Sequence, residues 1–441
     1  MAQPMIRETA ISESQYNGLN ILGMVNYNNN SSVVKIGNSI LKNHHYITLR
    51  DTKDMYYYDS RSGIYLPNGE TYLDEEITKY LKANFQSIKL SEVKKYVQTK
   101  TYQLRTNIGT PKGKLTLLNG ILDIKNRIIS PHSYNNITLS CLPIKFNRSA
   151  KCPLFLNFLQ QIMSPQEADI LQEYIGYCLQ RGYEYKKALL LRGPPNTGKT
   201  TLLRILITFL GKENISSISL NDLETRFSIA ELFGKMANIC DELSAEDMKK
   251  TNQFKGLTGS SQLKAENKFK DPFTFTNEAK LIFATNQTPK APNPMDDAFF
   301  ERWQVIKMVN QFNGANADPH LFEKITTPNE LSGILNWVLD GLDRLNKRGR
   351  FIDLPSLIEV KAEFGCIDSV ALFVQDKVTF DPIAVTPKQT LFLAYTSNCG
   401  NRGLSAESYG EFCKRICHLN GVSVYRSGGK TRVEAFRGIR L

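Results

Sequence analysis

The chain has 441 residues, too many for one hydrophobic core, so roughly two to four domains are expected. Hydrophobic residues make up 41% and charged residues 22%, as in ordinary globular proteins, and no run of about 18 apolar residues could span a membrane. The net charge of +12 favours a nucleic-acid partner, although a general basic bias would give the same balance.

The N-terminal third of the chain is predicted to form a small α+β domain at residues 46–150, after a polar segment at residues 1–45. Residues 28–32 of that segment are rich in asparagine and serine and are expected to be a loop. The predicted elements of the domain are short strands at 56–58 and 64–66 around a turn, a helix with apolar residues from Leu73 to Phe85, and two strands between 115 and 129.

A helical linker is predicted next, at residues 151–185, followed by an α/β unit at 186–310. Apolar strands alternate with helices in this unit, which predicts a parallel sheet. A helical segment at 311–378 opens with a loop and holds predicted helices near 331–346 and 357–364. Residues 379–387 contain two prolines and are expected to be a linker to a separate basic unit at 388–441.

The octapeptide GPPNTGKT at residues 193–200 matches the phosphate-binding loop pattern G-x-x-x-x-G-K-[ST]. An apolar run precedes it and a helical pattern follows, which is the context that the motif requires. We expect its backbone N–H groups to wrap the phosphates of ATP, with Lys199 reaching the β- and γ-phosphates and Thr200 holding Mg²⁺. The predicted nucleotide-binding residues are Gly193, Pro194, Pro195, Asn196, Thr197, Gly198, Lys199, Thr200 and Thr201.

Polar residues follow two further apolar runs. Asp241 is expected to bind Mg²⁺ and Glu242 to polarise the water that attacks the γ-phosphate, although acids also gather at helix starts. Asn286 is expected to reach the same water from an adjacent parallel strand, although an asparagine after a strand is commonly a turn former. The predicted magnesium ligands are Thr200 and Asp241.

Arg302 lies in the charged stretch around AFFERW (residues 298–303). A lone arginine in such a stretch is usually solvated surface. Because the phosphate-binding loop, the two acids and Asn286 are also present, Arg302 is expected to be an arginine finger. A neighbouring subunit would supply it to the transferring phosphoryl group. The predicted catalytic residues are therefore Lys199, Asp241, Glu242, Asn286 and Arg302.

Two alternating segments flank the residues KFKDP (268–272), which predicts a β-hairpin. Its tip combines cations with an aromatic ring, a combination that suits binding to single-stranded nucleic acid. A surface hairpin that only aids solubility explains the same residues equally well. The predicted DNA-binding residues here are Lys264, Lys268, Phe269 and Lys270.

The basic unit at 388–441 resembles a winged-helix domain, with a helix at 391–398, a second helix capped by Ser405, and a hairpin wing. Such a surface fits duplex DNA, and an idle basic tail is the alternative. The predicted DNA-binding residues of this unit are Lys414, Arg415, Arg426, Lys430 and Arg432. Cys413, Cys417 and His418 lack a second pair at zinc-site spacing, so no metal site is expected there.

Together, GPPNTGKT, ICDE (239–242), the hairpin region (257–275), FATN (283–286) and AFFERW resemble the superfamily 3 helicases, a branch of the AAA+ ATPases. Within them the chain is most similar to the helicase part of primase-helicases from phages, plasmids and large DNA viruses. NGILD (119–123) and AKCP (150–153) are similar to that family's helicase-associated domain. The resemblance covers about nine tenths of the chain.

The resemblance implies a homo-hexameric ring that binds ATP and Mg²⁺ between subunits and moves along single-stranded DNA, usually 3′ to 5′, to unwind forked DNA. Lys199, Thr200, Asp241, Glu242 and Asn286 would act in cis and Arg302 in trans. Larger relatives carry a primase domain upstream, for which this chain begins too close to its helicase-associated domain. No primer synthesis is therefore expected, and a separate primase or polymerase would be a partner.

Two other functions remain open. An ATP-regulated initiator or origin-binding scaffold would melt DNA without translocating far, and a non-DNA AAA+ remodeller is disfavoured by the positive charge. The scattered cysteines and the lack of an apolar signal core indicate a reducing, cytoplasmic location in a host cell, without secretion or membrane attachment.

Overall fold

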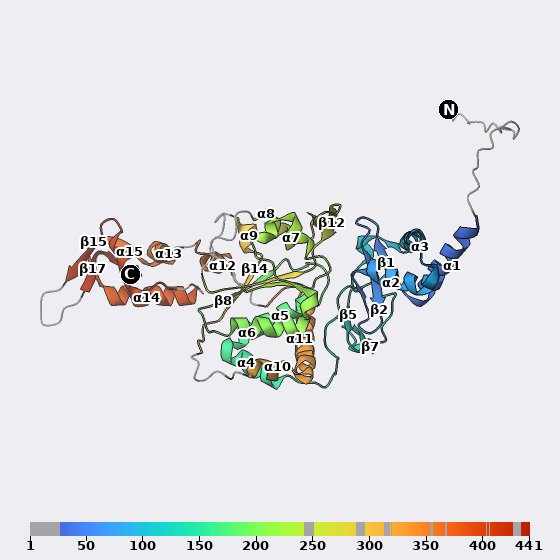
Figure 1. Ribbon diagram of the computed structural model, residues 1–441. Coiled ribbons are helices and arrows are strands. Elements are labelled where there is room, and N and C mark those ends of the chain that lie inside the picture. The colour runs from blue at the N-terminus through green and yellow to red at the C-terminus, as the bar shows by residue number, and fades with distance from the viewer. Residues whose placement is uncertain are drawn as a thin grey trace, which may run out of the picture.

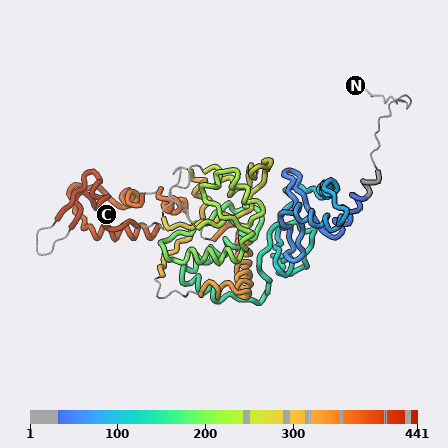
Figure 2. Tube along the Cα trace, viewed as in Figure 1, coloured from blue at the N-terminus to red at the C-terminus, as the bar shows by residue number. Residues whose placement is uncertain are grey.

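The computed structural model describes residues 27–241, 251–287, 296–312, 318, 320–352, 356–366, 368–402, 404, 406–426 and 434–441, with the backbone alone at 27–31. The chain forms an N-terminal unit, a central unit built around a parallel sheet, and a C-terminal unit (Figure 1). The tube view shows the same order along the molecule, with the central unit between the other two (Figure 2).

The N-terminal unit packs three helices against a four-stranded sheet of order β3-β2-β1-β4. Its elements are α1 (Tyr27–Asn43), β1 (Tyr46–Leu49), β2 (Met55–Asp59), β3 (Ile64–Leu66), α2 (Gly69–Leu81), α3 (Ser87–Lys100) and β4 (Tyr102–Gln103). The predicted strands at 56–58 and 64–66 are confirmed, and they pair antiparallel with Tyr58 opposite Tyr65.

Two predictions for this unit are wrong. Residues 28–32 lie in helix α1, because Val33 and Ile40 are buried against the other helices and this tertiary packing outweighs the low helix propensity of asparagine. The helix expected to reach Phe85 ends at Leu81, where Lys82 takes a φ of 46°, and Phe85 is half exposed.

A second small sheet follows, with three antiparallel strands where two were predicted: β5 (Lys114–Leu117), β6 (Gly120–Asp123) and β7 (Ile128–Ser130). Gly120 has a φ of 139°, and a Cβ there would lie 2.4 Å from the Ser130 carbonyl oxygen, so only glycine fits this turn. Leu115, Leu117 and Leu122 are buried in the same hydrophobic core as the central unit.

The central unit holds a five-stranded, all-parallel sheet of order β14-β8-β13-β10-β9, which confirms the predicted parallel sheet. Its strands are β8 (Ala188–Arg192), β9 (Ile215–Ser216), β10 (Ala237–Cys240), β13 (Lys280–Thr285) and β14 (Trp303–Lys307). β8, β10 and β13 are almost wholly buried, as expected for strands covered by helices on both faces.

Helices cover both faces of this sheet, with α5, α6 and α11 on one side and α7, α8 and α9 on the other (Figure 1). The helices are α4 (Pro153–Ile162), α5 (Pro165–Cys178), α6 (Lys199–Leu210), α7 (Arg226–Ala230), α8 (Asn252–Leu257), α9 (Asp297–Phe300), α10 (Leu321–Ile325), α11 (Pro328–Arg348) and α12 (Leu357–Glu363). The helical linker is thus two helices, separated where Ser164 and Glu167 form a capping box. The predicted helices near 331–346 and 357–364 are α11 and α12.

The C-terminal unit has its own core and a three-stranded antiparallel sheet of order β15-β17-β16. Its elements are α13 (Ser369–Lys377), β15 (Thr379–Pro387), α14 (Lys388–Asn401), α15 (Tyr409–Cys417), β16 (Ser423–Arg426) and β17 (Glu434–Arg440). The predicted hairpin between β16 and β17 is confirmed, with Val424 opposite Phe436.

The linker prediction for residues 379–387 is wrong, because this segment is the edge strand β15 and pairs with β17. Two prolines are tolerated there since the pairing is interrupted between Asp381 and Val385, around Pro382, and Pro387 ends the strand. Nowhere in the described part of the chain does a helix have the length and apolarity needed to cross a membrane.

Candidate nucleotide site and DNA-binding hairpin

The predicted phosphate-binding loop joins the end of β8 to the start of α6, in the expected strand, loop and helix context. Two glycines are required by the space around them. A Cβ at Gly193 would lie 2.0 Å from the Met308 carbonyl oxygen, and one at Gly198, whose φ is 85°, would lie 2.9 Å from Ile162 Cγ2. The backbone can therefore approach its neighbours, and a phosphate, more closely than side chains would allow.

Lys199 is buried at the first position of α6, and its ammonium lies inside the loop. Nζ donates to the carbonyl oxygens of Gly193 and Pro194 at 2.7 Å each and to Thr197 Oγ1 at 3.1 Å. Burial lowers the pKa of the Lys199 ammonium below its ordinary value. Thr200, next along the helix, is exposed. A buried cation beside the free N–H groups of a helix start suits a phosphate chain.

The structure brings two of the other predicted catalytic residues to the same edge of the sheet. Asp241 follows β10 and Asn286 follows β13, and both are exposed. β13 lies between β8 and β10, with Thr285 opposite Arg192 and Phe283 opposite Cys240, so all three strands end together. Ligands of open parallel sheets bind at this carboxyl edge. Glu242 lies outside the described residues.

Arg302 lies at the other end of these strands, beside their amino ends. It immediately precedes β14, whose first residue, Trp303, pairs with Ala188 at the start of β8. The loop begins at the other end of that strand, about 15 Å away at roughly 3.3 Å per residue. Arg302 Nη1 donates to the Ala298 carbonyl oxygen, while buried Nε has no partner among the described residues. Arg302 therefore cannot reach the loop of its own chain.

No sequence motif indicates a buried carboxylate that lies behind the phosphate-binding loop. Glu363, at the end of α12, is only 2% exposed and pairs with Arg192, which ends β8, and with Lys307, which ends β14, at 2.8 Å. Burial lowers the pKa values of both cations. This cluster fixes the ends of the two strands that flank the loop. No sequence pattern links a helix glutamate to these cations 56 and more residues away, and only the position of Arg192 directly before Gly193 hints at it.

The predicted hairpin is present, with β11 (Gln262–Ala265) paired to β12 (Phe273–Thr276). Phe269 at its tip has a φ of 63° and a side chain that is fully exposed. Lys264 and Lys268 are exposed as well. Lys270, however, forms an ion pair with Asp54 of the N-terminal unit. The tip thus presents a ring and cations, one of which already has a protein partner.

The predicted basic residues of the C-terminal unit differ in their surroundings. Lys414 is exposed, and Arg426 is exposed with its Nε 3.4 Å from a Glu434 oxygen. Arg415 does not face outward freely as predicted, because its guanidinium is held by Asp368 and Glu407. We therefore assign Arg415 to the packing of this unit.

Three other predictions for the C-terminal unit concern residues outside the described part of the chain: Lys430, Arg432 and the cap Ser405. The helix that Ser405 was expected to cap is α15. Its start is capped by Ser408, whose side chain accepts a hydrogen bond from the Glu411 N–H group.

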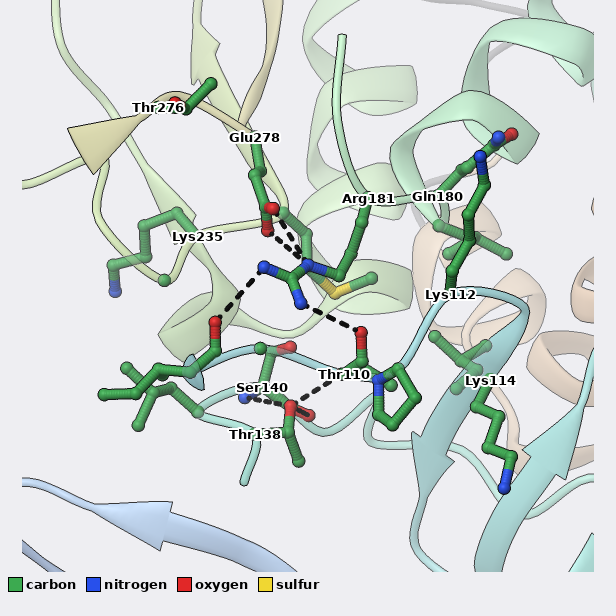
Figure 3. A pocket seen from close by; sticks show the side chains of 18 of the residues that line it. Thr110, Lys112, Lys114, Thr138, Ser140, Gln180, Arg181, Lys235, Thr276 and Glu278 are labelled. Atoms are coloured by element: carbon green, nitrogen blue, oxygen red, sulfur yellow. Dashed lines mark hydrogen bonds and ion pairs between the residues drawn. The ribbon is translucent and has the colours of Figure 1, made fainter. Parts of the chain in front are cut away.

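A cavity of about 430 Å³ lies away from the loop, where the N-terminal half of the chain meets the central unit. Arg181 crosses it, pairing with both oxygens of Glu278 at 2.8 and 3.0 Å and donating to the carbonyl oxygens of Ile108 and Thr110 (Figure 3). A Cβ at Gly109 would lie 2.4 Å from the guanidinium carbon. These contacts satisfy the cation within the protein, so we assign the cavity to the joint between the units.

Arg181→Ala is expected to destabilise the joint by about 1 to 2 kcal/mol, because it leaves the partly exposed Glu278 and two carbonyl groups without their charged donor. Thermal unfolding followed by circular dichroism measures the loss. Lys112→Ala, which removes an exposed cation from the same rim, is the control and should change the melting temperature little. Equal melting temperatures for Arg181→Ala and the parent would contradict this role.

Comparisons with known proteins give two family matches. Residues 32–164 match the family described as D5 N terminal like, and residues 191–302 match a family of unknown function, DUF5906. Both families are typical of primase-helicase proteins of phages and viruses. They indicate a replication protein of that type, and DNA binding with it.

The chain also matches solved structures of the NrS-1 C-terminal region at low sequence identity. One apo structure of residues 305–718 is 12% identical, with 92% of this chain and 99% of that chain covered and a TM-score of 0.48. Another, the A form apo structure, is 13% identical, with 91% and 99% covered and a TM-score of 0.47.

Proposed function

We propose that this protein is an ATP-dependent DNA helicase of a virus or another mobile element, acting as a ring on single-stranded DNA in the host cytoplasm. The observation that carries the proposal is the meeting of Lys199, Thr200, Asp241 and Asn286 at one edge of the parallel sheet. The family matches to primase-helicase proteins support it. The sheet and its flanking helices would then be an AAA+ core.

In the proposed reaction, Lys199 exchanges its loop partners for the β- and γ-phosphates of ATP. Thr200 and Asp241 would hold Mg²⁺, which neutralises charge on the phosphates when bound. Glu242 would take a proton from the attacking water, and the Asn286 amide would orient that water. The residues present fit both groups, since oxygen ligands and a buried cation are what magnesium and a triphosphate require.

Arg302 would complete the site of a neighbouring subunit. Its place beside the amino end of β8 supports this role, because it lies too far from its own loop to act there, and ring interfaces join different surfaces of neighbouring subunits. A hexamer is the ring that the sequence resemblance implies.

Unwinding of a tailed duplex tests the proposal. The protein should hydrolyse ATP faster with single-stranded DNA present and should release a labelled strand from a duplex with a 3′ tail. The same duplex with a 5′ tail is the polarity control. Hydrolysis of ATP without release from either substrate would contradict a helicase.

An ATP-regulated origin-binding scaffold is the second candidate, favoured by the C-terminal unit. Its order of helix, strand, two helices and a hairpin fits a winged helix, for which Lys414 and Arg426 offer exposed cations. This unit would then begin at α13, earlier than the sequence suggested.

Lys268→Ala with Lys270→Ala separates the two candidates. A helicase should lose tenfold or more of its unwinding rate, about 1.4 kcal/mol, because the hairpin loses its phosphate contacts, while ATP affinity stays unchanged. Strand release and ATP binding measure this, with Lys212→Ala as a control at an exposed site on the central unit. A scaffold should bind and melt DNA as before.

A further inference from the structure

The hairpin tip does not stand alone, because a turn of the N-terminal unit lies beside it. This turn, residues 50–54, joins β1 to β2, and its Asp54 pairs with Lys270 of the tip. Behind the pair, the Arg105 guanidinium carbon lies 3.9 Å from the centroid of the Phe273 ring, at the start of β12 directly after the tip. Figure 1 likewise shows β12 on the side of the central unit that faces β1.

Arg105 is fixed from both sides. It donates to both oxygens of Asp51 at 2.8 and 3.0 Å, and its guanidinium also lies 4.4 Å from the Phe233 ring centroid. The two units are therefore joined by an ion pair at the tip and by the Arg105 cation, which contacts the rings of Phe233 and Phe273. This contact holds the turn and the tip in one continuous surface.

The turn carries two exposed cations of its own, Arg50 and Lys53. Lys53 Nζ lies 4.6 Å from the centroid of the Tyr102 ring and donates to the Arg50 carbonyl oxygen at 2.7 Å. The Arg50 guanidinium lies 6.0 Å from the same ring. Both cations are thus held over a half-buried aromatic platform, which limits the entropy lost when they bind an anion.

The charge of this surface is positive in spite of its acids. The cations are Arg50, Lys53, Arg105, Lys268 and Lys270, and the acids are Asp51, Asp54 and Asp271. Asp51 and Asp54 are each paired with one of these cations, Arg105 and Lys270. Arg50, Lys53 and Lys268 are exposed, as is the Phe269 ring, and the pair of Asp54 with Lys270 brings the turn and the tip together.

We propose that Arg50 and Lys53 form a second contact for single-stranded DNA, so that the N-terminal unit binds the backbone of the strand whose neighbouring part meets the hairpin tip. This inference rests on the proposed function of the hairpin. Cations bind the phosphates of single-stranded and of duplex DNA alike. The exposed Phe269 ring favours single-stranded DNA, because it can stack on an unpaired base. Asp54 opposes this binding, because a phosphate must compete with it for Lys270.

Fluorescence anisotropy with a labelled oligothymidine of about 20 nucleotides, titrated with the full chain at several salt concentrations, tests the inference. Arg50→Ala with Lys53→Ala should weaken binding about tenfold and reduce the salt slope by about 1.4, at roughly 0.7 per phosphate contact on single strands. Asp54→Asn should instead tighten binding several-fold. Lys125→Ala with Lys145→Ala removes the same charge from exposed sites elsewhere and should change little.

The outcomes separate the two proposals. If Lys268→Ala weakens binding while Arg50→Ala with Lys53→Ala matches the Lys125 and Lys145 control, the second contact is wrong and the proposed function stands. If the parent chain binds no oligothymidine even at low salt, both are wrong. Unchanged thermal unfolding and DNA-independent ATP hydrolysis in the Arg50 and Lys53 variant show that any loss of binding is not a loss of folding.

Discussion

Lys199→Ala is expected to lower the affinity for ATP about a hundredfold. Its ammonium is buried inside the loop and is bonded to two carbonyl oxygens at 2.7 Å, so it is already placed where a phosphate chain would lie. Hydrogen bonds to charged groups contribute about 1.5 to 3 kcal/mol each, and losing the equivalent of about 3 kcal/mol gives this factor. Titration with a fluorescent ATP analogue in the presence of magnesium measures it.

Lys212→Ala is the matched control, because Lys212 is exposed just beyond the other end of α6. It removes the same charge without touching the loop and should leave ATP affinity within about twofold of the parent. ATP binding by Lys199→Ala at the parent's affinity would show that the loop does not hold the phosphates, and the proposed function would fall with it.

The parts of the site that the sequence predicts correctly are those written in short stretches of chain. GPPNTGKT predicts a turn that needs two glycines, and the structure shows both the tight contact at Gly193 and the positive φ at Gly198. Apolar runs predict β10 and β13, and the polar residue after each run lies at the carboxyl edge because all these strands are parallel. The alternating segments around residues 268–272 also predict the hairpin correctly, because its two strands are neighbours in the sequence.

Features that depend on distant partners could not be predicted in this way. β15 is a strand because it pairs with β17, with Thr379 opposite Arg440, and its own two prolines indicate a linker. α1 is a helix because its apolar face is buried, although its first residues favour a loop. The pairing of Glu363 with Arg192, and of Asp54 with Lys270, arises only when elements far apart in the chain meet.

Arg302 shows how both kinds of information combine. Its motif suggests an arginine finger, but which site it serves depends on the direction and order of the strands. β14 runs parallel to β8 and starts beside Ala188, so Arg302 is separated from its own loop by the whole length of β8. A catalytic role for this residue therefore requires a second subunit.

Arg302→Ala is expected to lower the turnover number for ATP about a thousandfold or more, while ATP affinity stays within about threefold of the parent. An arginine finger meets the phosphoryl group mainly in the transition state, so its loss affects kcat more than binding. Steady-state hydrolysis and nucleotide titration measure the two effects. Arg302→Lys should recover little, because lysine keeps the charge but lacks the planar fork.

Mixing Arg302→Ala with Glu242→Gln distinguishes a finger supplied in trans from one acting within its own chain. Each variant alone should be inactive, but an Arg302→Ala subunit keeps an intact site that a Glu242→Gln neighbour can complete with its own arginine. In rings assembled at random from equal amounts, about one quarter of the interfaces have this arrangement, so up to about a quarter of the parent's hydrolysis should return. A mixture no more active than its components would mean that Arg302 does not serve a neighbour. Because the structure places Arg302 too far from its own loop, that result would remove it from the catalytic residues altogether.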